Sequence, residues 1–571
     1  MSVFVVLSPI SSMFRLVFTP DHPKYQTQIN DIFINRLWGI GLFLAALLLC
    51  GVALGNVPLR DWDEGIVAQV AREIAVGEAN WLHPTLHGIP YLNKPPLVHA
   101  LISWMYNLWG VEEWTARFPS ALLTAASVPV LYWLGLELFR RRTPAIFSAL
   151  VYLTLLPVIR HGRLAMLDGT VLFLMILMIG CVLRSRRNLK YALGSGLAFG
   201  FLCLTKGVIL GILLGGIAIF FLVWDTPRLL KSRFFGLGIA LGCIPVLYWY
   251  TAQWIDQGEV FITTNLFSQS LRRIWQPVES NQGNPFYYLF EILKYSLPWL
   301  IFWIPGLYFS WQNRRFSWAK LILVWTGVYL LAISAMSTKL PWYVLPVYPA
   351  FALAVGAYLA QVWREGDRET GHWSVQVHHH PDVLSPLPDK LWPIVAILAG
   401  VSWVACFYLN NLIPLIPVSG VDLPLKLTAT AIALTLTASA FLMLQKDRQF
   451  IIILIWGLYV SLFLFFTSTH WVWELAEDYP VKPVAELIQT HTPANAKVYT
   501  SHPTSRPSLN FYSDRKVQPR DLEELQQYWQ GSKNAYFLLD RSTFNELQIK
   551  PSDALGTVQG WTLIKPPLPA A

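Results

Sequence analysis

The ionisable residues that could carry out chemistry stand in segments far apart in the chain. An acidic pair, Asp63-Glu64, is followed by Lys94, and Asp168 stands at the start of an apolar run. Further cations occur at Lys206, Arg272, Arg273 and Lys339. Arginine binds phosphate through paired hydrogen bonds and lysine binds it as a point charge, whereas a carboxylate can take a proton from an attacking hydroxyl. These residue types indicate transfer of a group from a phosphate.

Each of these residues also has a structural explanation, which the sequence leaves open. An acidic pair at a helix N-terminus is often only a favourable partner for the helix dipole. Asp168 could cap its helix, and Lys206 could extend its ammonium to the membrane interface. Arg272 and Arg273 could be solvated loop charges or contact lipid headgroups. Lys339 and Tyr343 could anchor a helix end at the interface.

The composition is that of a protein that crosses a membrane many times. Of the 571 residues, 54% are hydrophobic and only 13% are charged, whereas about 25% of residues are charged in soluble proteins. This deficit excludes a disordered chain, a soluble enzyme and a nucleic-acid binder with a broad basic face. The five cysteines lie in apolar stretches, where we expect small buried side chains and neither disulfides nor metal ligands.

Apolar segments recur along the chain and predict an all-α polytopic membrane protein with about 13 transmembrane helices, since about 20 apolar residues cross a bilayer. The expected spans are 37–55, 119–139, 143–158, 170–183, 191–204, 208–224, 234–254, 287–309, 321–335, 343–362, 391–409, 425–444 and 450–466. Residues 1–36 are expected to be cytoplasmic and residues 37–467 to form the membrane domain. With this topology every inner loop is basic, as the positive-inside rule requires.

The first external loop, residues 58–115, is expected to be structured and to lie against the membrane. Residues 66–75 have apolar side chains at helical spacing and polar ones on the other side, which predicts an amphipathic helix on the outer membrane surface. Residues 97–109 are apolar but too few to span a bilayer, so they predict a re-entrant or interfacial helix. Most of the unusual ionisable residues fall on this side, where they would converge on a lipid-accessible site.

After the last span the chain is no longer uniformly apolar. Residues 497–500 and 535–540 have strand-like patterns, and residues 481–489 and 521–529 have helix-like patterns. Residues 468–571 are therefore expected to form a small extracytoplasmic α/β domain.

Several motifs occur in an order that resembles the polyprenyl-phosphate-dependent GT-C glycosyltransferases. In chain order they include Arg60-Asp-Trp-Asp-Glu-Gly65, Pro90-Tyr-Leu-Asn-Lys-Pro-Pro-Leu97, Ala116-Arg-Phe-Pro-Ser120, Leu164-Ala-Met-Leu-Asp168, Leu204-Thr-Lys-Gly207 and Ser337-Thr-Lys-Leu-Pro-Trp-Tyr-Val-Leu-Pro346. The chain is similar in particular to the lipid A aminoarabinose transferases (ArnT-like), within the broader protein O-mannosyltransferase-like family. The resemblance covers roughly residues 35–360.

This resemblance implies a GT-C fold and a role for each matching residue. Asp63, beside Glu64, matches the family's candidate catalytic carboxylate, and Asp168 matches a second essential acid. Lys94 matches the residue that binds the lipid-linked phosphate, and Asn93 stands before it where the aminoarabinose enzymes commonly have Glu. The matching cations near the phosphate and the tyrosines that line the cavity are Lys206, Arg272 or Arg273, Tyr91 and Tyr343.

The implied activity is transfer of a sugar from a polyprenyl (undecaprenyl) phosphate to a lipid, glycan or protein acceptor at the outer face of a bacterial inner membrane. The acidic pair could also hold a divalent cation. An alternative is a secondary transporter or flippase of a lipid-linked or anionic substrate, although transporters place their binding residues near the bilayer midplane. A non-catalytic subunit that binds a lipid phosphate through the same cations is a second alternative. No nucleic-acid partner is expected.

Overall fold

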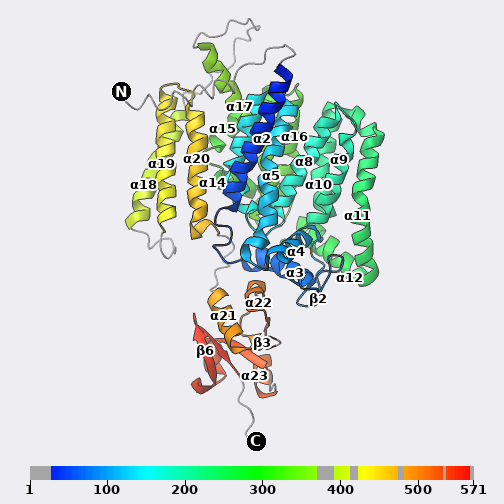
Figure 1. The fold of residues 1–571 in the computed structure, drawn as a ribbon, viewed down its shortest axis with the longest axis vertical. Coiled ribbons are helices and arrows are strands. Elements are labelled where there is room, and N and C mark those ends of the chain that lie inside the picture. The colour runs from blue at the N-terminus through cyan, green and yellow to red at the C-terminus, as the bar shows by residue number, and fades with distance from the viewer. Residues whose placement is uncertain are drawn as a thin grey trace.

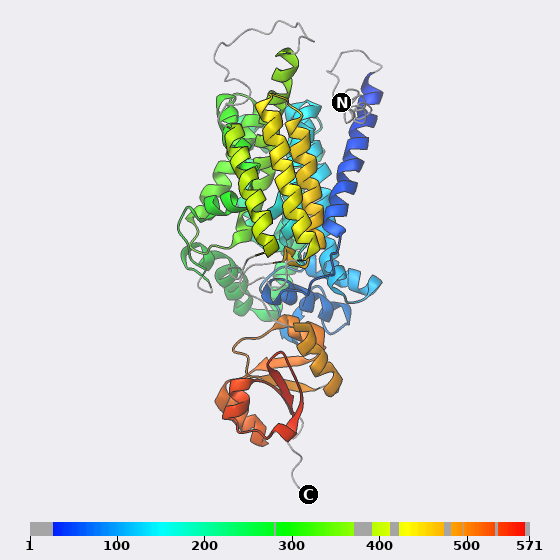
Figure 2. The ribbon, with the colours of Figure 1, turned by 90° about the vertical axis from the view of Figure 1, so that its left-hand side faces the viewer.

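The computed structural model describes residues 27–278, 281–369, 391–411, 422–472, 481–494, 496–531 and 535–565. Residues 1–26, which include most of the expected cytoplasmic segment, lie outside this part of the chain. Long helices stand side by side in a bundle, and a small domain of helices and strands projects from one end of it (Figure 1, Figure 2).

The bundle is built from helices that run the length of the apolar segments. They are α2 (Thr27–Gly51), α5 (Glu113–Phe139), α6 (Arg142–Leu153), α7 (Leu156–Gly162), α8 (Asp168–Ser185), α9 (Tyr191–Lys206), α10 (Val208–Asp225), α11 (Arg233–Gln257), α14 (Tyr287–Tyr295), α15 (Leu300–Gln312), α16 (Ser317–Ala335), α17 (Tyr348–Glu369), α18 (Leu391–Asn411), α19 (Leu423–Leu444) and α20 (Phe450–Thr467). Shorter helical segments connect them: η2 (Pro227–Lys231), α12 (Glu259–Phe261), η3 (Ile262–Leu271), α13 (Arg272–Trp275), η4 (Pro341–Val347) and η5 (Thr469–Trp471).

Every expected span falls on one or two of these helices, which confirms the polytopic all-α fold class. Two expected spans are each broken, 143–158 into α6 and α7 and 287–309 into α14 and α15. Pro157 and Pro298 stand at the breaks, where proline removes a backbone donor and its ring hinders the continuing helix. Among the described residues, nine helices are long and apolar enough to cross a membrane, or ten if α6 and α7, bent by 59°, form one span. The number of crossings stays a prediction.

The loops that were expected to lie inside meet at one end of the bundle. Glu137, near the end of α5, pairs with Arg184 at the end of α8, with 2.8 Å between Oε2 and Nη1. Asp225, at the end of α10, pairs with Arg186 (3.0 Å) and with Lys320 in the first turn of α16 (3.4 Å). The first external loop and the small domain lie together at the opposite end (Figure 1). The alternation of the predicted spans therefore agrees with the fold.

The first external loop is folded, and its elements are η1 (Asp61–Gly65), α3 (Ile66–Ala75), β1 (Thr85–Leu86), β2 (Ile89–Pro90) and α4 (Leu97–Trp109). α3 and α4 pack against each other at the end of the bundle (Figure 1). The polar side of α3 is not exposed as an amphipathic surface helix would require, because the β1–β2 hairpin folds over it. Glu73 is 2% exposed and accepts hydrogen bonds from Thr85 Oγ1 and the His87 backbone N–H, both at 2.6 Å.

The small domain contains a five-stranded mixed sheet with strand order β4-β3-β5-β7-β6. Parallel pairing joins β3 to β4 and to β5, and antiparallel pairing joins β7 to β5 and β6. Its elements are α21 (Val481–His491), β3 (Lys497–Thr500), α22 (Pro507–Ser513), β4 (Lys516–Pro519), α23 (Leu522–Gly531), β5 (Ala535–Asp540), α24 (Arg541–Glu546), η6 (Pro551–Asp553), β6 (Ala554–Val558) and β7 (Trp561–Ile564). The strand-like and helix-like patterns are confirmed in β3, β5, α21 and α23. The carboxyl end of β3 leads to α22, which lies next to the first external loop.

Glycines let α9 and α11 approach so closely that their backbones touch. A Cβ atom on Gly200 would lie 2.0 Å from the carbonyl oxygen of Gly242, and one on Gly196 would lie 2.0 Å from the carbonyl carbon of Gly238. Small residues four apart allow such close helix packing in membranes. This contact holds α9, and with it Lys206 at the helix end, in place.

We expect Gly200→Ala to destabilise the protein by about 1–3 kcal/mol, because the new methyl group forces α9 and α11 apart. Thermal unfolding of the detergent-solubilised protein measures the effect. Gly236→Ala is the matched control, since it lies in α11 with open space around its Cβ position. Equal unfolding temperatures for the two variants would show that the α9–α11 contact does not require glycine.

Candidate functional site

Lys94 lies in the turn between β2 and α4, where three other charged side chains act on it. Burial, followed by the charges of Arg273 and Lys206, lowers the pKa of Lys94 to about 7, while the Asp168 carboxylate acts in the opposite direction. The four residues come from the first external loop, α13, α9 and α8. The structure thus brings together cations and a carboxylate that the sequence analysis selected from distant segments.

Asp168 and Lys206 form an ion pair at the ends of adjacent helices. Asp168 is the first residue of α8 and Lys206 the last of α9, and 2.6 Å separates Oδ1 from Nζ. Leu167, not Asp168, is the N-cap of α8. The Lys206 ammonium also lies 5.7 Å from the centre of the Tyr343 ring. The pairing argues against the capping explanation for Asp168 and the snorkelling explanation for Lys206.

The structure distinguishes the two adjacent arginines of α13. Arg273 donates from Nη1 to the Tyr343 hydroxyl (3.0 Å) and from Nη2 to Gln269 Oε1 (2.8 Å). Its Nε is buried and has no hydrogen-bond partner in the described part of the chain. Arg272 is exposed and donates from Nε to Gln276 Oε1 (2.7 Å). Arg273 is therefore the arginine that faces Lys94, and it keeps a donor for a further ligand.

The turn that bears Lys94 is anchored by a residue that the sequence analysis missed. Asn265, in η3, donates from its side-chain nitrogen to the backbone carbonyl of Leu92 (2.8 Å). Tyr91 is buried in this turn and Asn93 is half-buried. No sequence signal could have found Asn265, because an isolated asparagine in a short polar helix has many structural explanations.

Lys339 does not join this cluster of cations. Its Nζ donates to the carbonyls of Ile333 (3.1 Å) and Ser334 (2.7 Å) at the end of α16. The ammonium also lies 5.3 Å from the centre of the Tyr288 ring, and Lys339 is 4% exposed. The sequence predicts a substrate-binding role for Lys339, but these contacts favour the alternative that Lys339 anchors a helix end.

Glu64 is fully buried and pairs with Arg117 through two hydrogen bonds. Arg117 Nε donates to Oε1 (2.8 Å) and Nη2 to Oε2 (2.7 Å), and the backbone N–H groups of Ala165 (2.7 Å) and Arg60 (3.1 Å) donate to the same carboxylate. Burial by itself would raise the pKa of Glu64, but the Arg117 guanidinium and these hydrogen bonds hold it below its usual value. With its oxygens fully engaged, Glu64 is a structural anchor, which corrects the catalytic role predicted for it.

Arg117 is the second functional residue that the sequence analysis missed. Besides pairing with Glu64 it donates to the carbonyls of Leu54 (2.9 Å), Val57 (2.7 Å) and Pro58 (3.0 Å), which follow α2. It thereby joins α5 to the segment that enters the first external loop. The motif Ala116–Ser120 contains it, but with Glu112, Glu113 and Thr115 just before it nothing in the sequence indicates that this arginine is buried against a partner 53 residues away.

Asp63 is half-buried in η1, between Asp61 and the anchored Glu64. η1 is a π-helical turn, a conformation that often occurs at functional sites. Within the described residues, no group of three or more His, Cys, Asp or Glu side chains could hold a metal ion. The divalent cation considered from the sequence therefore lacks a ligand set in this part of the chain, because Glu64 is engaged by Arg117 and Asp168 by Lys206.

The helical bundle, the folded first loop and the α/β domain define a membrane protein with the GT-C fold. The structure superimposes on the crystal structure of ArnT from Cupriavidus metallidurans bound to undecaprenyl phosphate with a TM-score of 0.73, covering 92% of this chain and 97% of that chain at 20% identity. Residues 93–249 match the family model described as dolichyl-phosphate-mannose-protein mannosyltransferase.

Curated relatives carry the name undecaprenyl phosphate-alpha-4-amino-4-deoxy-L-arabinose arabinosyl transferase. The protein from Aeromonas hydrophila is 28% identical over 348 residues, which are 58% of this chain and 61% of the relative. A protein from Pseudomonas fluorescens is 28% identical over 333 residues, or 57% of this chain and 60% of the relative. The matched region thus spans about three fifths of these relatives. The resemblance to ArnT-like GT-C glycosyltransferases, predicted from the sequence, is confirmed.

We expect Glu64→Gln to destabilise the fold by about 3–5 kcal/mol, because it leaves the Arg117 charge buried without a counter-charge. The midpoint of unfolding in detergent measures this loss. Glu78→Gln makes the same chemical change at an exposed position of the same loop and should alter stability by less than about 0.5 kcal/mol. A Glu64→Gln protein as stable as the Glu78→Gln protein would refute the anchoring role.

Proposed function

We propose that this chain is an integral membrane glycosyltransferase that transfers a sugar from a polyprenyl phosphate, in the first instance undecaprenyl phosphate, to a lipid, glycan or protein acceptor. The site would face the outer side of a bacterial inner membrane, with the N-terminus cytoplasmic. The observation that carries the proposal is the convergence of Lys94, Lys206 and Arg273 at the helix ends beside the first external loop. The fold and the names of the curated relatives support it.

These cations could stabilise the negative charge of a phosphate leaving group. Three cations face one carboxylate, Asp168, so the site has an excess of positive charge. Burial makes that excess costly until an anion enters. The unpartnered Nε of Arg273 offers one donor to such an anion. Donors that are already oriented toward the departing charge stabilise the transition state without reorganisation.

In the proposed reaction an acceptor hydroxyl oxygen attacks the anomeric carbon of the sugar. The bond from that carbon to the phosphate oxygen breaks, and its electron pair stays on the phosphate, beside Lys94, Lys206 and Arg273. Asp63 takes the hydroxyl proton as general base or orients the acceptor. Asp168 fixes the Lys206 ammonium. The buried ring of Tyr91 and the half-buried ring of Tyr343 line the site.

The place of the charged groups favours a transferase over a transporter. Asp168 begins α8 and Lys206 ends α9, so both lie at helix ends next to the folded external loop. Transporters bind their substrates near the bilayer midplane. A non-catalytic lipid-phosphate-binding subunit would tolerate loss of the carboxylates but not of the cations, which separates it from the proposed enzyme experimentally.

We expect Asp63→Asn to abolish sugar transfer while leaving binding of undecaprenyl phosphate intact, because the carboxylate acts on the acceptor and not on the phosphate. Transfer is measured in membranes with radiolabelled undecaprenyl-phosphate sugars, starting with the aminoarabinose donor named for the relatives. Arg273→Ala should weaken binding of undecaprenyl phosphate, whereas Arg272→Ala, at the exposed neighbour, should not. Parent-level transfer by both Asp63→Asn and Lys94→Ala would overturn the proposed function.

We expect binding of undecaprenyl phosphate to weaken as the pH rises from 6 to 8, because Lys94 must be protonated to hold the phosphate and its pKa is about 7. The Lys94→Arg variant keeps its positive charge throughout this range. Titration of the phosphate itself affects the parent and this variant equally, so it cancels in the ratio of their affinities. The affinity of the parent relative to Lys94→Arg should therefore fall by about tenfold between pH 6 and pH 8. A ratio that is independent of pH would show that Lys94 is already fully protonated or does not contact the phosphate.

A further inference from the structure

Asp61, two residues before Asp63, is held by the α/β domain. Its side chain is 1% exposed and forms an ion pair with Arg506, with 2.5 Å between Oδ2 and Nη1. The backbone N–H of Ser508 donates to Oδ1 at 3.1 Å, and the Ser508 hydroxyl donates to the same oxygen. All three donors come from the first turn of α22 or the residue before it. The domain therefore supplies a complete binding site for one carboxylate of the external loop.

The contact between η1 and α22 leaves no room for adjustment. A Cβ atom on Gly65 would lie 2.8 Å from the backbone nitrogen of Ser508. Trp62 Nε1 donates to the Ser505 carbonyl at 3.2 Å, and the Arg506 guanidinium lies 5.8 Å from the centre of the Trp62 ring. Residues 61, 62 and 65 of η1 are thus all fixed by the domain.

The same turn is fixed from its other side by the bundle. Glu64 is held by Arg117 of α5, and the N–H of Gly65 donates to the Arg60 carbonyl at 2.7 Å. Asp63 therefore lies in one turn between a carboxylate fixed by the domain and a carboxylate fixed by the bundle. Its position depends on both, because a π-helical turn of five residues has little freedom once its two ends are held.

From this arrangement we infer that Arg506 and Ser508 are positioning residues for Asp63, so that the α/β domain completes the active site across the domain boundary. The inference rests on the proposed function, in which Asp63 is the catalytic carboxylate. Arg506 and Ser508 act through Asp61 and do not touch the substrate. A displacement of about 1 Å at a catalytic group can cost about a hundredfold in rate, which is the range in which loss of this contact should fall.

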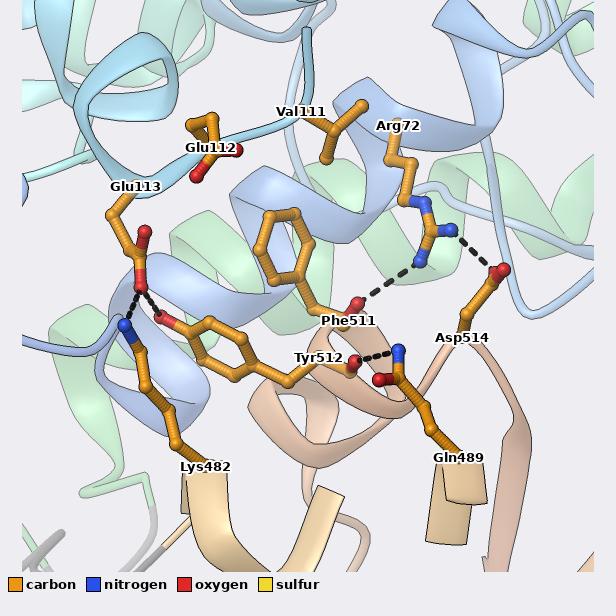
Figure 3. Close-up of a pocket in the computed structure, with 9 residues that line it drawn as sticks. All are labelled: Arg72, Val111, Glu112, Glu113, Lys482, Gln489, Phe511, Tyr512 and Asp514. Atoms are coloured by element: carbon orange, nitrogen blue, oxygen red, sulfur yellow. Dashed lines mark hydrogen bonds and ion pairs between the residues drawn. The ribbon is translucent and has the colours of Figure 1, made fainter. Parts of the chain in front are cut away.

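Other contacts across the same boundary provide matched controls. A pocket of about 390 Å³ lies between the loop and the domain, and Figure 3 shows an ion pair on each side of it. Glu113 pairs with Lys482 of α21, and Arg72 of α3 pairs with Asp514 just after α22. These pairs join the two parts as the Arg506–Asp61 pair does, but neither involves a residue of η1. Variants of these two pairs therefore weaken the attachment of the α/β domain to the loop without removing a contact to the turn that carries Asp63.

The test compares Arg506→Ala with Asp514→Ala and Lys482→Ala in the full-length protein. We expect Arg506→Ala to lower kcat for sugar transfer by about tenfold to a hundredfold, with the affinity for undecaprenyl phosphate unchanged, because the cation cluster is untouched. Arg506→Lys retains a charge for Asp61 and should recover part of the lost rate. The two controls should keep a kcat close to that of the parent.

Hydrogen exchange of a peptide covering residues 58–66 gives a readout that does not require activity. Exchange in this peptide should be faster in Arg506→Ala than in either control, while the unfolding temperatures of the three variants stay similar. Equal kcat and equal exchange in Arg506→Ala and Asp514→Ala would overturn the inference. If neither the parent nor Lys94→Ala transfers sugar but residues 58–66 still exchange faster in Arg506→Ala than in the controls, the proposed function fails. The conclusion that Arg506 holds η1 in place then remains. If Asp63→Asn is inactive and Arg506→Ala is not, only the positioning role fails.

Discussion

The buried ion pair between Arg117 and Glu64 is the constraint on which the end of the bundle next to the α/β domain depends. One guanidinium joins α5, the segment after α2 and η1, and the Glu64 carboxylate also accepts the Ala165 N–H just before α8. A buried pair compensates for the desolvation of its charges only when its geometry and its remaining hydrogen bonds are satisfied. That condition is met here, so the segments that carry Asp63 and Asp168 have one relative placement.

The site built on this anchor has more positive than negative charge. Asp168 neutralises Lys206 at 2.6 Å, whereas Lys94 and Arg273 repel one another and burial disfavours the charged form of Lys94. An anion is the ligand that relieves both penalties. The lowered pKa of Lys94 thus has the same cause as the proposed affinity for a lipid phosphate: the fold concentrates cations where water is scarce.

The three carboxylates of η1 have different environments although they lie within four residues. Asp61 is bound by Arg506 and Ser508 of the α/β domain, and Glu64 is bound by Arg117 of the bundle. Asp63 lies between them and is half-buried. This division explains how an acidic turn can be rigid, since the Asp61 and Glu64 carboxylates compensate the positive charges of Arg506 and Arg117 that hold the turn.

The fold class, the position of most helices and most of the candidate cluster could be predicted from the sequence, because apolar run length and short motifs are local properties of the chain. Lys94, Asp168 and Lys206 could be selected in this way. Three assignments depend on contacts that form only in the folded protein: Arg273 rather than Arg272 faces Lys94, Lys339 contacts the end of α16, and Glu64 is an anchor. The reason is physical: the role of a charged side chain depends on its partner. A partner can lie far along the chain, as Arg506 does at 445 residues from Asp61, and no spacing in the sequence records which residues will meet.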